Sequence, residues 1–174
     1  MAIAIIVEDG SNVPDANAYV SVADVRQYAT ARGITLPADD DAVAAMIVSA
    51  TDYLESLRCQ YQGFPTYAAT GGQSLEWPRE CVVINVQPFP NDAIPKQLKA
   101  AQCAGVVAIN EGYTLLQNTN ASDYVIEETV GPITTKYADP IKAGVETNFA
   151  TVDAAIAPLM KNCCGTSPLR TVRV

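Results

Sequence analysis

Residues that commonly carry out catalysis are few in this chain, and none of them forms a recognisable catalytic motif. The sequence contains no histidine, which excludes Ser-His and Cys-His nucleophilic schemes and histidine-ligated metal sites. Five cysteines lie at irregular spacings without a C-x-x-C motif: Cys59, Cys81, Cys103, Cys163 and Cys164. Because structural zinc sites use ligand pairs at short spacings, we expect no metal, no cofactor and no enzymatic activity.

Three further patterns resemble ligand sites but have simpler structural explanations. The acidic run Asp39–Asp41 would suit a cation, yet carboxylates are also favoured at the start of a helix. Gly71 and Gly72 are not followed by a lysine, so they do not form a phosphate-binding loop. Aromatic residues that could stack on nucleic-acid bases are Tyr53, Tyr61, Tyr67 and Trp77. Stacking surfaces come with a basic groove, and only Arg58 and Arg79 lie nearby, so we interpret these aromatic residues as core and edge residues.

The charge distribution also argues against a nucleic-acid-binding protein. The 174 residues carry a formal net charge of −8, whereas nucleic-acid binding usually leaves a basic footprint. Residues 1–55 hold nine acidic and two basic residues, while residues 154–174 hold three basic and no acidic residues. The acidic front and the basic tail could pair within the chain or between copies. The alternative is a solvated acidic surface with a frayed tail.

Length and hydropathy indicate one domain made in a reducing compartment. A chain of 174 residues can bury a core without disulfides or metals. No secretory signal is recognisable, and no apolar run approaches the ~18 residues that a membrane span needs. We therefore expect reduced thiols, a cytoplasmic site of synthesis and no membrane association.

A central helix over Asp41–Gln60 is the strongest structural prediction. Its apolar residues recur with helical spacing: Val43, Met46, Ile47, Ala50, Tyr53, Leu54 and Leu57. A first helix is predicted from Val22 to about Ala31, with Ser21 as N-cap, Asp24 completing a near capping box three residues on, and Gly33 at its end. A third helix begins near Ile94 with Pro95 in its first turn. Small residues in this helix and in the central helix predict that the two pack closely together.

The remaining segments predict short elements and loops. Gln62–Gln73 is predicted to be a loop, Cys81–Val86 a strand, and Gln87–Asp92 a rigid irregular connection. Two strands are predicted around Gly131 and Pro132. A last helix is predicted from Val152 to about Met160, with Thr151 as its cap and Pro158 shortening it. Trp77 is predicted to plug an edge of the core with its indole N–H hydrogen-bonded.

Together these elements predict a mainly α fold. We expect a small helical bundle of three main helices and a short C-terminal helix, with a β-hairpin appendage and extended termini. The domain would span residues 1–162, including a β element at about 123–138, and residues 163–174 would form an extended tail.

Six segments, taken in order, resemble a known protein family. They are Val7–Gly33, Ser49–Gly63, Leu75–Arg79 (LEWPR), Ile94–Val106, Val130–Tyr137 (VGPITTKY) and Val152–Met160. Their order and spacing resemble a family of tailed-bacteriophage proteins that is often labelled DnaT-like single-stranded-DNA-binding protein. That family is similar to the head–tail connector, or neck adaptor, proteins of long-tailed phages and gene-transfer agents. The Gln62–Gln73 loop and the tail after Lys161 are not part of the resemblance.

The resemblance implies a structural virion protein with no active site. Relatives form a ring, commonly of twelve copies, beneath the portal protein, where the ring extends the DNA channel and joins the capsid to the tail. The implied partners are identical copies, the portal, and a downstream neck or tail-completion protein, while DNA passes without sequence-specific binding. The implied location is the virion neck, with assembly in the host cytoplasm.

Two contact hypotheses follow. The basic tail, with Leu169, Arg170, Val172 and Arg173, is predicted to dock on the portal or on a neighbouring copy. The predicted β element is expected to lie between subunits, because unpaired strand edges need a partner; its contact residues would be Tyr124, Ile126, Glu128, Ile133, Thr135 and Tyr137. The rival hypothesis is a replication accessory protein that binds single-stranded DNA.

Overall fold

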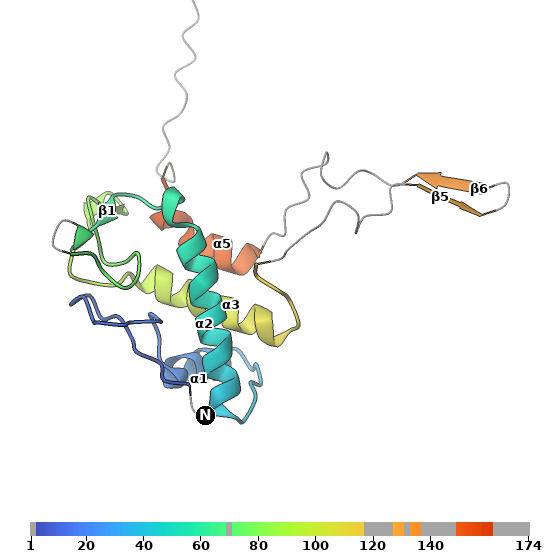
Figure 1. Cartoon of the computed structure of the whole chain (residues 1–174), viewed down its shortest axis with the longest axis horizontal. Coiled ribbons are helices and arrows are strands. Elements are labelled where there is room, and N and C mark those ends of the chain that lie inside the picture. Colours follow the sequence, from blue (N-terminus) through green and yellow to red (C-terminus); the bar gives the residue numbers. More distant parts are fainter. Residues whose placement is uncertain (1–2, 69–70, 117–126, 131–132, 137–148, 162–174) are drawn as a thin grey trace, which may run out of the picture. The chain divides into compact units, whose positions relative to one another are not determined.

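A computed structural model describes residues 3–68, 71–116, 127–130, 133–136 and 149–161 (Figure 1). The chain divides into two compact units. The first comprises Met1–Leu115 and Phe149–Val174, and the second comprises Leu116–Asn148. Each unit is described by itself below.

Helix α1 spans Val22–Thr30 and begins with the predicted capping box. The Ser21 hydroxyl accepts a hydrogen bond from the Asp24 backbone N–H at 3.2 Å, and the Asp24 carboxylate accepts one from the Ser21 N–H at 2.9 Å. Gly33 follows the helix with a φ of +69°, a left-handed conformation that suits glycine. The predicted extent of this helix is confirmed.

Asp24→Ala is expected to lower the free energy of unfolding by about 1 kcal/mol at pH 7, because the Ser21 N–H and hydroxyl lose the carboxylate that accepts their hydrogen bonds. The hydrogen bonds from Ser21 lower the pKa of Asp24, so the cap stabilises the fold above the ordinary pKa of an aspartate. That stabilisation is lost as the pH falls through the lowered pKa. Urea unfolding measured from pH 7 down to pH 3 should therefore show that the variant and the wild type approach the same free energy of unfolding. Asp52→Ala, an exposed site inside the next helix, should show no such convergence.

Helix α2 spans Asp40–Ser56 and is followed by the short 3-10 helix η1, Arg58–Gln60. Asp39 is its N-cap, and the Asp39 carboxylate accepts a hydrogen bond from the Asp41 N–H at 3.1 Å. Its buried residues are Val43, Ala44, Ile47, Ala50, Thr51 and Leu54. The predicted central helix is confirmed, and the predicted role of the acidic run as a helix start agrees with this cap.

Helix α3 spans Lys96–Asn110, with Pro95 as N-cap rather than inside the first turn. It packs against α2 through small residues, as predicted: a Cβ on Gly105 would lie 3.2 Å from the Ala50 Cβ. Helix α5 spans Ala150–Ile156 and continues as the 3-10 helix η4, Ala157–Leu159, which contains Pro158. The shortening by Pro158 is confirmed, but Thr151 is not the cap, because the helix starts one residue before it and Phe149 occupies the N-cap position.

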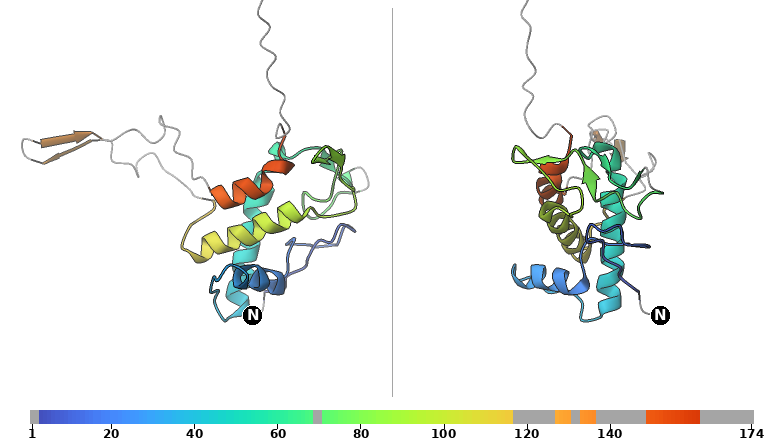
Figure 2. Two further views of the ribbon diagram at one scale, coloured as in Figure 1. Left: turned by 180° about the vertical axis from the view of Figure 1, so that it is seen from behind. Right: turned by 90° about the vertical axis from the view of Figure 1, so that its left-hand side faces the viewer.

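The mainly α class is confirmed, but a helical bundle is not. Helices α3 and α5 lie side by side, and both cross α2 instead of running along it (Figure 2). Helix α1 packs against both α2 and α3.

The strands form two-stranded antiparallel pairs. Strand β1 (Phe64–Pro65) pairs with β2 (Arg79–Glu80), and β3 (Val83–Ile84) pairs with β4 (Gln87–Pro88). Three sequence predictions are therefore corrected. The Gln62–Gln73 loop contains strand β1, and the strand predicted over Cys81–Val86 is shorter and turns back into β4. The connection predicted over Gln87–Asp92 is not wholly irregular, because it begins with β4. Proline at a strand edge does not prevent pairing, because its missing N–H faces outward.

In the second unit, β5 (Glu127–Val130) pairs with β6 (Ile133–Lys136). The two strands predicted around Gly131 and Pro132 are confirmed at the level of the backbone.

Trp77 lies in the centre of the core of the first unit and is fully buried. Its ring packs edge-on against Tyr61, with ring centroids 5.6 Å apart. The prediction of a hydrogen-bonded indole is wrong, because the Trp77 Nε1 has no partner among the described residues. Aromatic contact takes the place of the polar contact at this position.

Candidate interaction surfaces

The described part of the chain contains no constellation typical of an active site. Within it, no group of three or more Cys, Asp and Glu side chains could hold a metal ion. Cys59, Cys81 and Cys103 are free thiols, and burial raises the pKa of Cys103 to about 11, which leaves this thiol unreactive. None of the helices in the described ranges has both the length and the apolar character needed to cross a membrane.

The predicted contact residues fall largely outside the described ranges. Those outside are Leu169, Arg170, Val172, Arg173, Tyr124, Ile126 and Tyr137. Glu128 lies in β5 opposite Thr135 in β6, and Ile133 begins β6 opposite Val130. Both contact hypotheses stay predictions.

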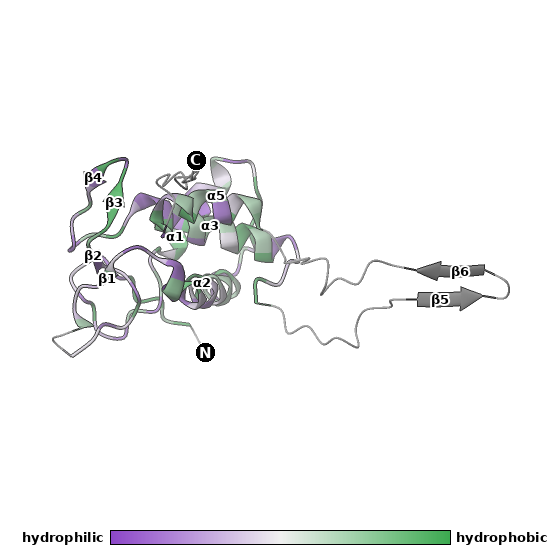
Figure 3. Ribbon diagram, turned by 90° about the horizontal axis from the view of Figure 1, so that it is seen from above, coloured by the Kyte–Doolittle hydropathy of each residue, from purple (hydrophilic) through white to green (hydrophobic). Residues whose placement is uncertain are grey.

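A surface that the sequence analysis did not identify lies at the four short strands of the first unit. We call β1, β2, β3 and β4, with the turn Asn85–Val86, the β knob. It exposes three apolar side chains: Phe64 is 51% exposed, Val83 is 39% exposed and Val86 is 83% exposed. From Cys81 to Asn91 the chain has no charged residue. Figure 3 shows hydrophobic colouring on β3, while β4 beside it is more polar.

The turn that joins β3 to β4 has an unusual conformation for its sequence. Asn85 has a φ of +51° and Val86 has a φ of +66°. Two consecutive left-handed residues form the hairpin turn that usually contains Asn-Gly. Asparagine tolerates this conformation, but a β-branched residue there is a genuine outlier. The only signal of this turn in the sequence was an asparagine within an uncharged, mostly apolar run. The glycine that usually identifies such a turn is absent, so the turn was not predicted.

A buried arginine fixes the β knob to the core. The Arg79 guanidinium donates hydrogen bonds to the Gln62 carbonyl at 2.8 Å, the Gly63 carbonyl at 2.9 Å and the Glu76 carboxylate at 2.7 Å. The Gln62 side chain in turn accepts from the Val83 N–H at 3.2 Å and donates to the Pro158 carbonyl at 2.9 Å. The knob therefore has a rigid base attached to η4.

A second buried network joins the loop between β1 and β2 to α2. The Tyr19 hydroxyl donates a short hydrogen bond to Glu55, and the other Glu55 oxygen accepts from the Glu76 N–H at 2.9 Å. Burial raises the pKa of Glu55 and also raises the pKa of the Tyr19 phenol. Both groups serve the structure, because the Glu55 carboxylate is held by hydrogen-bond donors on two sides.

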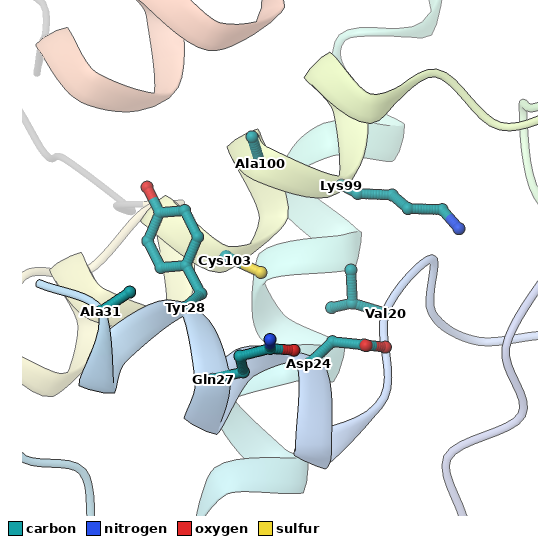
Figure 4. Close-up of a pocket in the computed structure, with 8 residues that line it drawn as sticks. All are labelled: Val20, Asp24, Gln27, Tyr28, Ala31, Lys99, Ala100 and Cys103. Atoms are coloured by element: carbon teal, nitrogen blue, oxygen red, sulfur yellow. The ribbon is translucent and has the colours of Figure 1, made fainter.

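A groove of about 370 Å³ lies between α1 and α3. Its lining residues are Val20, Asp24, Gln27, Tyr28, Ala31, Lys99, Ala100 and Cys103. Figure 4 shows Tyr28 and Ala31 at one end, Asp24 and Lys99 at the other, and Cys103 between them. The lining is mostly apolar, with one acidic and one basic residue.

Several basic side chains are engaged in contacts within the described part of the chain. Arg26 pairs with Asp40 at 2.6 Å, and Arg79 pairs with Glu76. Arg32 stacks 3.4 Å from the centre of the Tyr28 ring, while the Lys161 ammonium donates to a backbone carbonyl. These contacts reduce the positive charge that is available for phosphate groups.

Comparison with known proteins identifies one family. The model of the family described as "Putative DnaT-like ssDNA binding protein" matches residues 3–174. No curated protein and no solved structure matches the chain. The match covers nearly the whole sequence, so the chain belongs to this DnaT-like family.

Proposed function

We propose that this protein is a structural virion protein, a head–tail connector that forms a ring beneath the portal of a tailed phage. The observation that carries the proposal is the β knob, which exposes three apolar side chains on a base fixed by Arg79 and whose β3–β4 hairpin carries no charge. Such surfaces mark protein–protein contacts in otherwise soluble domains. In this role the partners are identical copies, the portal above and a neck or tail protein below.

Charge supports the same role. A channel that passes DNA must not hold it, and a chain with a net charge of −8 repels phosphate. Arg79 is buried and paired with Glu76, and Arg26 pairs with Asp40 at the surface, so both positive charges are already matched within the chain. Ring contacts between identical copies need two different complementary patches, and the knob supplies one.

The second candidate is a replication accessory protein that binds single-stranded DNA. The description of the family supports this function directly and favours it over the connector role. Against this function, a strand-binding groove combines aromatic platforms with unpaired basic residues, whereas Arg26, Arg32, Arg79 and Lys161 are engaged in contacts within the described part of the chain.

Two measurements separate the candidates. A gel shift with single-stranded oligonucleotides at low and high salt should show no tight binding for a connector, whereas a strand-binding protein loses affinity steeply with salt. Mass spectrometry of purified particles should find the connector in stoichiometric amounts. Tight, salt-sensitive oligonucleotide binding by a protein absent from particles would overturn the proposal.

Deleting residues 165–174 is expected to weaken ring assembly or portal attachment while leaving the melting temperature of the folded units unchanged. The deleted segment contains Arg170 and Arg173 and no acidic residue, so it can complement an acidic partner surface. A pull-down with portal protein checks the result. Lys161→Ser, which removes a nearby positive charge outside the segment, is the control and should retain binding.

A further inference from the structure

The β knob and the α1–α3 groove are exposed on the same unit but cannot meet within one copy. Strand β1 lies beyond the end of α2, whereas α1 lies beside its beginning (Figures 1 and 2). One feature is a protrusion with Val86 at its tip, and the other is a mostly apolar hollow. Two different patches that fit each other on identical chains define a heterologous contact, which closes into a ring or continues as a filament.

The conformation of Val86 indicates that the side chain at the tip matters. Its φ of +66° is unfavourable for a β-branched residue, and its side chain is 83% exposed, so no contact within the chain compensates for the strain. Glycine would fit this turn better. Strained residues cluster at sites of interaction and binding, and a contact outside the chain would account for both the strain and the exposure.

Charge selects the partner for this tip. Copies with a net charge of −8 repel each other, so they can meet only where both surfaces lack excess negative charge. The hairpin is uncharged from Cys81 to Asn91. In the groove, Asp24 is balanced by Lys99, which contributes to lowering the pKa of Asp24 after the larger effect of Ser21. Interface centres are depleted of charge in the same way.

We propose that the β3–β4 turn of one copy inserts Val86 into the α1–α3 groove of a second copy. The inference rests on the proposed structural role and names the contact that joins neighbouring subunits. Cys103 and Ala100 form the groove wall on α3, and Tyr28 and Gln27 form the wall on α1. The second copy receives the tip there, while its own tip remains available for a third copy.

Substitution at the tip separates assembly from stability. Val86→Gly relieves the left-handed strain, so its melting temperature should equal or exceed that of wild type, while self-association measured by concentration-dependent light scattering should weaken at least ~10-fold. Ala100→Arg places a charged side chain in the groove on a helix that tolerates it and should have the same effect on assembly. Ile3→Ser removes another exposed apolar side chain, one that belongs neither to the β knob nor to the groove lining, and should leave assembly unchanged.

Cross-linking tests the geometry directly. With all native cysteines replaced, Cys103 by alanine and the other four by serine, Val86→Cys combined with Gln27→Cys should form a ladder of disulfide-linked multimers on oxidation. A ladder requires that each copy use both patches. As a control, Val86→Cys combined with Asp52→Cys should form no ladder, because Asp52 is exposed on α2 and does not line the groove. Gln27→Cys with Cys163 and Cys164 retained tests whether the chain's own tail fills the groove.

Each outcome decides the inference. A ladder with the Gln27 pair and loss of assembly in Val86→Gly support it. Three results would overturn it. They are self-association without that ladder, a disulfide between position 27 and the tail cysteines, and no self-association up to the solubility limit. If the protein is still found in virions, the connector role survives these failures. Tight oligonucleotide binding with absence from virions removes the connector role itself.

Discussion

Gly63→Ala is expected to lower the free energy of unfolding by about 3–5 kcal/mol. Gly63 has a φ of +63°, and a Cβ added there would lie 1.7 Å from the backbone oxygen of Glu80. Backbone atoms of the paired strand cannot move aside as a flexible side chain can. Relief of the clash would separate β1 from β2 and break the hydrogen bond from buried Arg79 to the Gly63 carbonyl. Urea unfolding followed by Trp77 fluorescence measures the loss.

Gly33→Ala is the matched control for this substitution. Gly33 has a similar φ of +69°, but a Cβ there would meet nothing within 4 Å. Only the backbone conformation then opposes alanine, and the expected cost is about 1–2 kcal/mol. Equal losses for the two variants would show that the close approach of β1 and β2 does not matter. Gly63→Ala should also weaken self-association, since it displaces the β knob, whereas Gly33→Ala should not.

The helices of this protein could be predicted from sequence because their signals are local. Ser21 and Asp24 form a capping box three residues apart, and the apolar spacing of α2 follows the helical period. The small residues of α2 and α3 correctly predicted a close approach, which Gly105 makes against Ala50. The crossing of the helices was not predictable, because an apolar stripe does not specify the angle at which a partner packs.

The β knob could not be predicted because its determinants are not local. Gly63 contacts Glu80, and Arg79 binds carbonyls more than a dozen residues earlier in the chain. Strands of two residues are too short to show an alternating pattern. The turn at Asn85 lacks the glycine that usually identifies it, so Val86 was interpreted as part of a strand and its exposure was missed. The candidate interaction surface therefore depends on contacts that only the folded chain brings together.

The buried polar contacts illustrate the same limit. Glu55 fits the polar positions of an amphipathic helix, and nothing in its neighbours indicates that Tyr19, 36 residues earlier, donates a hydrogen bond to it. Glu8 is fully buried, where its carboxylate accepts backbone N–H groups from Gly10, Asn12 and Val13. From the sequence, such acidic residues were expected to be either paired with the basic tail or solvated at the surface. The Glu8 and Glu55 carboxylates instead lie within the fold, where they accept hydrogen bonds from backbone N–H groups and hold those segments in place.

Tyr19→Phe is expected to lower the free energy of unfolding by about 2–3 kcal/mol at pH 7, because a buried carboxylate loses its hydroxyl donor. The same hydroxyl accepts a hydrogen bond from the backbone N–H of Trp77 at 3.3 Å. Tyr19→Phe therefore leaves two groups without a partner. Tyr61→Phe is the matched control. It removes a neutral hydrogen bond, 3.0 Å long, to the Leu54 carbonyl at an equally buried site and should cost about 1 kcal/mol.

The pH dependence distinguishes a lost charge-assisted bond from a general packing defect. Burial raises the pKa of Glu55, and the bond from Tyr19 opposes that rise. A carboxyl with a raised folded pKa favours the folded state most below its unfolded pKa, and that contribution is lost as the pH rises through the folded pKa. Without the Tyr19 hydroxyl the folded pKa rises further, so the loss becomes larger. The deficit of Tyr19→Phe should therefore be greatest near pH 7 and shrink toward pH 4, whereas the deficit of Tyr61→Phe should stay constant. A constant deficit for both variants would contradict the role of Glu55 as a titrating group that depends on Tyr19 and holds the loop between β1 and β2 to α2.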